Sequence, residues 1–406
     1  MAACSGQQQM LAPAPVAQGG GLIGASDNVR SIQLYAADEQ DLPVLNMHGG
    51  PALTLEFDLM TWQARPLSVY FYHADREWRR DLSPGEFMES FFRDDLLDYS
   101  VSRNTQVPFT HYRYRFPNES IGFRISGNYV LRVTEQGSED EPLFERPFFV
   151  AEGTAQALMS LDLLLTGPQV LPVIQPRLVV TPPTELTSAV FDMTACFIEG
   201  GRLLAARCTQ TPRLGGGADM LYYLEPEVSY GSRSGDYLVD IADLAPRGDV
   251  ERIDLSTTPF QVLLQPDYAR FPDTGSGRLL NGQSVIGGRD EFGDIEAEYV
   301  EVTFRYVPPD EQPLPGDLYV IGSFNNWQVD LGAAMRWESE PAWYESAALI
   351  KQGLHEYRYT SPDLAVRRML ESRLHRHVQW YTGLVYFRDH RLSTDRLLAR
   401  ARILSR

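Results

Sequence analysis

The feature that most constrains the fold is a short apolar strand that ends in a tight turn, within residues 318–327. The strand reads Leu-Tyr-Val-Ile and stops at Gly322. Two adjacent asparagines follow, and asparagine tolerates the left-handed backbone that a tight turn needs. Trp327 closes the turn with a large flat ring. Two more segments alternate as strands do, at residues 344–349 and 354–359, so this part of the chain is predicted to form a β-domain.

Together these segments resemble the early-set immunoglobulin-like sandwich of glycogen- and starch-binding modules. In those modules a tryptophan in this turn stacks on a sugar ring, and a basic residue in a later strand bonds the sugar hydroxyls. The resemblance gives these roles to Trp327 and Arg358. The modules carry a second tryptophan soon afterwards, whereas residues 360–365 of this chain read Thr-Ser-Pro-Asp-Leu-Ala. The resemblance therefore implies the fold, and carbohydrate binding is kept as an alternative function.

Composition narrows the class of protein. The chain has 406 residues, enough for about two to four domains. Its net charge of −18 repels phosphate backbones, which argues against nucleic-acid binding. No apolar run reaches the length of about 18 residues that a membrane-spanning helix needs. We find no nucleophile elbow, Walker loop, paired-cysteine zinc pattern or dinucleotide fingerprint, so we predict no catalytic residues, no metal site and no cofactor.

The first part of the chain reads as short strands separated by turn signals, a spacing typical of an antiparallel sandwich. The predicted strands are residues 31–35, 53–57, 67–72, 111–116 and 129–133, and only residues 84–99 could carry a helical turn or two. We predict an all-β protein of tandem immunoglobulin-like or early-set β-sandwich domains.

Several motifs of the first part and of the C-terminal part match one family in order. They are His73-Ala-Asp-Arg-Glu-Trp78, Ser102-Arg-Asn-Thr105, His111-Tyr112, Phe116-Pro-Asn118, Ser126-Gly-Asn-Tyr129, Ile350-Lys-Gln-Gly353, Leu384-Val-Tyr-Phe-Arg388 and Asp395-Arg-Leu-Leu398. With these motifs the chain resembles the plug proteins of the type IX secretion system of the Bacteroidota. Agreement at both ends of the chain is more specific than any single motif.

The resemblance implies a mechanical function and a location. Such a plug is a periplasmic protein associated with the outer membrane. It seals the translocon barrel of the secretion system when no substrate is passing. Its partner is that barrel, and sealing requires a broad complementary surface rather than a catalytic residue.

We predict five segments along the chain. A disordered tether with a possible lipoprotein N-terminus, residues 1–27, precedes a first β-sandwich at 28–153. A second β-domain follows at 154–274, then a linker at 275–294 rich in Gly, Asp and Ser, and the early-set-like sandwich at 295–406.

The three cysteines leave two questions open. Cys4 follows small residues and precedes a flexible run, which is typical of a lipidated N-terminus but also of a chance cysteine in a disordered tail. Cys196 and Cys208 flank the turn Glu199-Gly-Gly-Arg202. Simple pairing about that turn places the two thiols at offset positions and on opposite faces, which favours two separate buried thiols over a disulfide.

Two histidine patterns have the chemistry of a catalytic or a metal site. His73 and Asp75 have the chemistry of half an acid/base site, but solvated or hydrogen-bonded groups at a strand end explain them as well. His375 and His377 lie at strand spacing and could hold a metal on one face. No third ligand accompanies them and the adjacent arginine disfavours a cation, so neither pattern is predicted to be functional.

Overall fold

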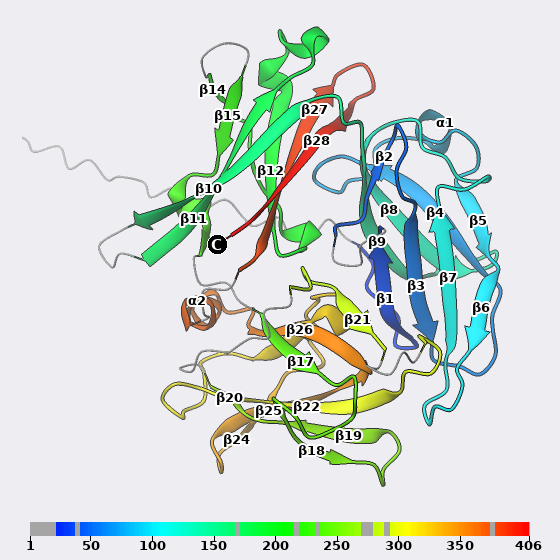
Figure 1. Cartoon of the computed structure of the whole chain (residues 1–406), viewed down its shortest axis with the longest axis vertical. Helices are drawn as coiled ribbons and strands as arrows, with labels where there is room; N and C mark the ends of the chain where they lie inside the picture. Colours follow the sequence, from blue (N-terminus) through cyan, green and yellow to red (C-terminus); the bar gives the residue numbers. More distant parts are fainter. Residues whose placement is uncertain are drawn as a thin grey trace, which may run out of the picture.

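The structure is a computed structural model that describes residues 22–36, 41–166, 171–214, 219–231, 236–268, 279–287, 293–373 and 378–405. The described residues form three β-sandwiches that contact one another, which confirms the predicted all-β class (Figure 1). Cys4, His375 and His377 lie outside the described residues, as do most of the predicted tether and part of the predicted linker.

Domain 1 consists of two sheets that enclose an aromatic core, including Phe57, Phe71 and Tyr129. All of its strands pair antiparallel except β2 with β9. The first sheet has the order β1 (Val29–Tyr35), β3 (Leu53–Leu59), β7 (Thr110–Phe116), β6 (Asp98–Val101). The second has the order β2 (Val44–Asn46), β9 (Pro142–Ala151), β8 (Gly127–Glu135), β4 (Leu67–Ala74), β5 (Arg93–Leu96), and α1 (Pro84–Phe87) is the one helical turn that the sequence allowed.

Domain 2 combines a central part of the chain with its C-terminal hairpin. One sheet contains β10 (Gln156–Thr166), β11 (Leu171–Thr181), β15 (Met220–Tyr223), β14 (Arg213–Leu214) and β16 (Tyr230–Gly231). The other has the order β13 (Arg207–Thr209), β12 (Met193–Glu199), β27 (Trp380–Asp389), β28 (Thr394–Leu404). Four 3₁₀ turns complete it: η1 (Thr184–Leu186), η2 (Val190–Asp192), η3 (Leu203–Ala205) and η4 (Pro226–Val228).

Domain 3 is the sandwich that carries the Trp327 turn. One sheet contains β17 (Tyr237–Asp240), β26 (Gly353–Thr360), β21 (Ser284–Ile286) and β23 (Tyr319–Gly322). The other contains β18 (Val250–Asp254), β19 (Phe260–Leu264), β20 (Asp267–Tyr268), β22 (Tyr299–Val307), β25 (Trp343–Lys351) and β24 (Arg336–Glu338). The turn η5 (Ser323–Asn325) and the helix α2 (Leu364–Arg373) belong to this domain, which is compatible with an early-set sandwich.

The chain passes through the domains in the order 1, 2, 3, 2, which differs from the expected boundaries. Residues 237–268, expected in the second domain, pair with strands of domain 3. Residues 380–404, expected in the third, pair with β12 of domain 2, and Figure 1 shows β27 and β28 in red beside the green β12. Because these strand partners are far apart in the sequence, no local sequence pattern marks the boundary between domains 2 and 3.

The expectation of two separate thiols is wrong, because Cys196 and Cys208 form a disulfide. The turn is not a simple one: η3 adds residues to the loop between β12 and β13. The register therefore places Cys196 directly opposite Cys208, with their Cα atoms 4.0 Å apart. Directly opposite residues of an antiparallel pair project from the same face, so the two sulfur atoms can bond.

Candidate functional site

Several of the motifs that carry the family resemblance lie where the three domains meet. Domain 1 contacts domain 2 through β8 and β9 on one side and the hairpin β27–β28 on the other. It contacts domain 3 through the outer face of β3 and β7. Domain 2 contacts domain 3 through the loop between β12 and β13.

The contact between domains 1 and 2 has an apolar centre. Val130 and Phe149 of domain 1 pack in one buried cluster with Ile198, Leu384 and Tyr386 of domain 2. Inside this cluster the Tyr386 hydroxyl donates to the Asn128 side chain at 2.7 Å. Apolar area shared by two domains is stabilising and leaves little room for relative motion.

Charged and polar bonds surround this apolar centre. Arg76 of domain 1 binds the Asp395 carboxylate at 2.9 Å, and Asp395 is almost fully buried. Arg396 donates two bonds to Glu152 at 2.7 and 2.9 Å. Arg76, Asp395 and Arg396 all belong to motifs of the family resemblance, from opposite ends of the chain.

His73 and Asp75 are structural residues of this contact. The two ring nitrogens of His73 lie 2.7 Å from the Asp81 carboxylate and 3.2 Å from the Ser126 carbonyl oxygen. The Asp75 carboxylate accepts bonds from the backbone N–H groups of the turn that follows it and from the Arg79 guanidinium. Gly127, in the next motif, has a φ of +148°, and a Cβ there would lie 2.5 Å from the His73 ring and 2.9 Å from the Asp395 backbone carbonyl oxygen of domain 2. Only glycine fits between the two domains at this point.

The contact between domains 1 and 3 is built on a buried ion pair. Lys351 is the only lysine of the chain, and its Nζ lies 2.5 Å from Oδ2 of Asp58. Both side chains are almost completely buried, and the ammonium lies 4.1 Å from the centre of the Phe109 ring. The Tyr299 hydroxyl also donates to Asp58, at 2.7 Å, and His111 Nδ1 lies 2.8 Å from its other oxygen.

The electrostatics of Asp58 follow from these neighbours. Burial acts to raise the pKa of this carboxyl group, but the charge of Lys351 and the hydrogen bonds from His111 and Lys351 outweigh burial and hold the pKa below its usual value. A buried carboxylate with three partners is a fixed link between domains, because removing any partner leaves a charge without compensation.

Sequence reasoning missed this pair, although a signal was present. Lysine occurs once in a chain with 36 basic residues, and that one lysine lies in the Ile-Lys-Gln-Gly motif. Residues 351–353 are buried in the structure. Asp58 lies on β3 of the first domain, and nothing in its local sequence marks it as the partner of a residue 293 positions away.

The contact between domains 2 and 3 contains the two residues predicted to bind sugar. The Trp327 indole N–H donates to the Gly282 carbonyl at 2.8 Å. The guanidinium groups of Arg202, from domain 2, and of Arg358 lie 5.3 and 5.8 Å from the Trp327 ring centre. Both arginines also bind Asp236, at 3.1 and 2.5 Å.

The structure thus places Arg358 and Arg202, which comes from another domain, beside the Trp327 ring. The left-handed backbone expected of the asparagine pair is present at Asn326, with a φ of +56°. The loop of domain 2 comes so close that a Cβ on Gly201 would lie 1.9 Å from the Asn281 carbonyl oxygen. Carbohydrate binding at Trp327 and Arg358 stays a prediction. Trp327 is engaged by Gly282 and by Arg202 of domain 2, and Arg358 by Asp236.

No helix within the described ranges is both long and apolar enough to span a membrane.

The three contacts together make the molecule one body of three sandwiches.

Comparison with known proteins agrees with the resemblance in the first domain. The family model described as "Type 9 secretion system plug protein 1st domain" matches residues 29–152, the whole of domain 1. A search of curated proteins found no match.

Two solved structures were compared over nearly the whole chain. A crystal structure of a hypothetical protein from Parabacteroides merdae ATCC 43184 has a TM-score of 0.84 at 22% identity and covers 95% of this chain and 99% of that chain. At this identity the likeness shows the fold alone. A serine-rich repeat protein of Streptococcus agalactiae, at 7% identity and 94% coverage of each chain, has a TM-score of 0.15 and carries no argument.

The prediction of the family is therefore confirmed in its first domain, and the all-β arrangement extends over the other two. The chain carries, at residues 29–152, the first domain of the type 9 secretion system plug protein family.

Proposed function

We propose that this protein is a non-catalytic periplasmic plug, which covers the periplasmic mouth of the outer-membrane translocon barrel of the type IX secretion system when no substrate is passing. The match of domain 1 to the plug family carries this proposal. The barrel is the proposed partner, and association with the outer membrane is the proposed location.

Two features of the molecule support a sealing role. Buried charges and apolar side chains fix each domain to the other two, and a seal must keep its shape under load. The disulfide between Cys196 and Cys208 is a bond that persists in oxidising compartments such as the bacterial periplasm.

The decisive experiment is affinity purification of the tagged chain from detergent-solubilised envelope, followed by mass spectrometry. We expect a very large outer-membrane barrel protein to be recovered with it. A tagged periplasmic protein of similar charge serves as the control. Recovery of the chain alone, under conditions in which another envelope complex survives, would reject the proposal.

Sealing itself is tested by permeability. A strain without this protein should admit a large antibiotic that the intact outer membrane excludes, and the wild-type gene should restore exclusion. Equal sensitivity of the two strains would argue against a plug.

A lipid anchor at Cys4 belongs to the same proposal. Cys4→Ser should move the protein from the membrane fraction to the soluble periplasmic fraction, and an unchanged distribution would reject the anchor.

The alternative function is tested on the same purified protein. Retardation on glycogen gels that is lost in Trp327→Ala would favour carbohydrate binding. The observed geometry does not favour it, because Arg202 and Arg358 already lie over the Trp327 ring.

A further inference from the structure

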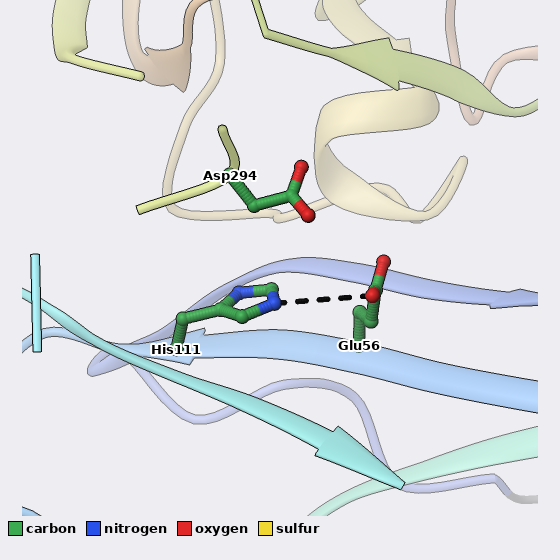
Figure 2. A group of neighbouring side chains, drawn as sticks. All are labelled: Glu56, His111 and Asp294. Atoms are coloured by element: carbon green, nitrogen blue, oxygen red, sulfur yellow. Dashed lines mark ion pairs between the residues drawn. The ribbon is translucent and has the colours of Figure 1, made fainter. Parts of the chain in front are cut away.

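Three side chains between domains 1 and 3 have the chemistry of a metal site. Glu56 of β3, His111 of β7 and Asp294, which precedes β22, place one ligand atom each within 4.8 Å of one another. Figure 2 shows Asp294 approaching from domain 3 toward His111 and Glu56, which lie on adjacent strands of domain 1. The distance from His111 Nε2 to Glu56 Oε1 is 3.9 Å.

His111 is prepared to act as a ligand. Its Nδ1 lies 2.8 Å from Asp58, so the carboxylate fixes the ring orientation and favours the tautomer with the proton on Nδ1. Its Nε2 is buried and has no hydrogen-bond partner in the part of the chain that the structure describes. A carboxylate behind a histidine whose other nitrogen is free is the arrangement found behind metal-binding histidines.

We propose that Glu56, His111 and Asp294 bind a divalent transition-metal ion of the zinc class, and that the ion fastens domain 1 to domain 3. One imidazole and two carboxylates suit Zn²⁺, which binds such atoms at about 2.0–2.2 Å. Tetrahedral ligands at that length are about 3.4 Å apart, so the set must contract slightly. Asp294, about one-third exposed, can make that movement and leaves the site open to solvent.

Arg113 is the competitor for this site. Its Nε donates to Glu56, and another of its nitrogens lies 3.4 Å from Asp294. Its side chain is 46% exposed, so it can turn into solvent when an ion takes its place. Either the guanidinium or the metal ion neutralises the two carboxylates, but not both at once. Removing Arg113 must therefore strengthen metal binding.

The experiment is calorimetric titration of Zn²⁺ into the chelator-treated full chain and its variants. We expect one ion per chain, with binding lost in Asp294→Asn, a substitution at a partly exposed position outside the domain cores. Arg113→Gln should bind about tenfold more tightly than the wild type, since a competing ion pair is gone. Visible absorption of the Co²⁺ form should show the tetrahedral spectrum in the wild type and lose it in Asp294→Asn.

A control variant separates this site from other histidines. The double variant His375→Ala, His377→Ala should bind Zn²⁺ as the wild type does. Zn²⁺ should also raise the thermal midpoint of the wild type and of Arg113→Gln and leave that of Asp294→Asn unchanged. Absence of binding in Arg113→Gln, or binding that survives Asp294→Asn, would overturn the proposal.

Discussion

Lys351 and Asp58 show how a single buried pair joins two domains. The ammonium and the carboxylate were both removed from water, and the hydroxyl of Tyr299 and the ring of His111 complete the bonding of Asp58. Such a pair has little net stabilising effect compared with apolar residues, but the loss of one partner is severe, because the other charge stays buried.

Lys351→Met should therefore lower the free energy of unfolding by about 3–5 kcal/mol, which calorimetry measures as a fall in the thermal midpoint. Adding Asp58→Asn should restore part of the loss, since it removes the stranded charge. Arg247→Met, which breaks an exposed pair with Asp243, is the matched control and should cost less than about 1 kcal/mol. If the loss of stability in the double variant equals the sum of the losses in Lys351→Met and in Asp58→Asn, the two residues act independently.

Glu356 makes folding take up a proton. Burial, and then the charge of Asp236, raise the pKa of Glu356 to about 7, against an ordinary value of 4.5. The unfolded chain thus loses its proton at a lower pH than the folded chain. The stability that this group contributes is fully present below pH 4.5 and is lost as the pH rises to 7. The adjacent His355, whose pKa burial lowers to about 4 from 6.5, has the opposite effect.

Glu356→Gln removes this proton uptake, and comparison with the wild type cancels the effect of His355. We expect the unfolding free energy of the variant, relative to the wild type, to rise by up to about 3 kcal/mol between pH 4.5 and 7. Denaturant titrations across that range provide the measurement. Glu119→Gln, at an exposed position, should show no such trend. A flat difference for Glu356→Gln would mean that folding does not raise the pKa of Glu356.

At the scale of the element, the loop that follows β12 determines the register in which β12 pairs with β13. The 3₁₀ turn η3 lengthens the connection to β13 and brings Cys196 opposite Cys208. Replacing both cysteines with alanine should cost about 2–4 kcal/mol of stability, because the unfolded chain is no longer cross-linked.

Thiol labelling tests the disulfide directly. In a Cys4→Ala background, the denatured chain should react with no maleimide before reduction and with two equivalents after it. Labelling of two thiols without reduction would show that the cysteines are separate.

Local patterns predicted the elements of domains 1 and 3 well, and for a clear reason. Alternation of apolar residues and turn signals are set by the neighbouring residues, so β7, β8 and β26 were found where predicted. The helix α2 was not predicted, although Asp363 caps it by accepting bonds from the N–H groups of Ala365 and Val366. Val366 and Leu370, one turn apart, pack in the core of domain 3, a signal that was present in the sequence.

Local sequence patterns could not predict the contacts between domains. The carboxylates of Asp58 and Glu56 lie on the outer face of β3, which extends beyond the predicted strand at 53–57, and solvent is the default expectation for such a face. Lys351 and Tyr299, which bind Asp58 from domain 3, are 293 and 241 residues away in the sequence. Sequence therefore predicted Trp327 and Arg358 as neighbours within one domain, but it could not predict that Arg202 of another domain joins them.

At the scale of the whole molecule, the order 1, 2, 3, 2 makes domain 2 depend on both halves of the chain. Strand β12 pairs with β27 over seven residues, and β28 extends the same sheet. The side chains of β27 and β28 also complete the core of domain 2 and the apolar contact with domain 1. The chain cannot finish folding domain 2 until its last hairpin is present.

A chain that ends at residue 377 should therefore keep domain 3 folded and lose domain 2. Without β27, strand β12 has a free edge, and apolar residues such as Phe197 and Ile198 lose their cover. Hydrogen exchange should show fast exchange over β12 and slow exchange over β22 and β26. Adding a synthetic peptide of residues 378–406 should restore protection of β12, because the missing strands supply their hydrogen bonds from outside. A peptide with Leu384→Asp and Leu397→Asp, which cannot fill the apolar contact, is the matched control. Full protection of β12 in the truncated chain alone would show that domain 2 is complete without its C-terminal hairpin.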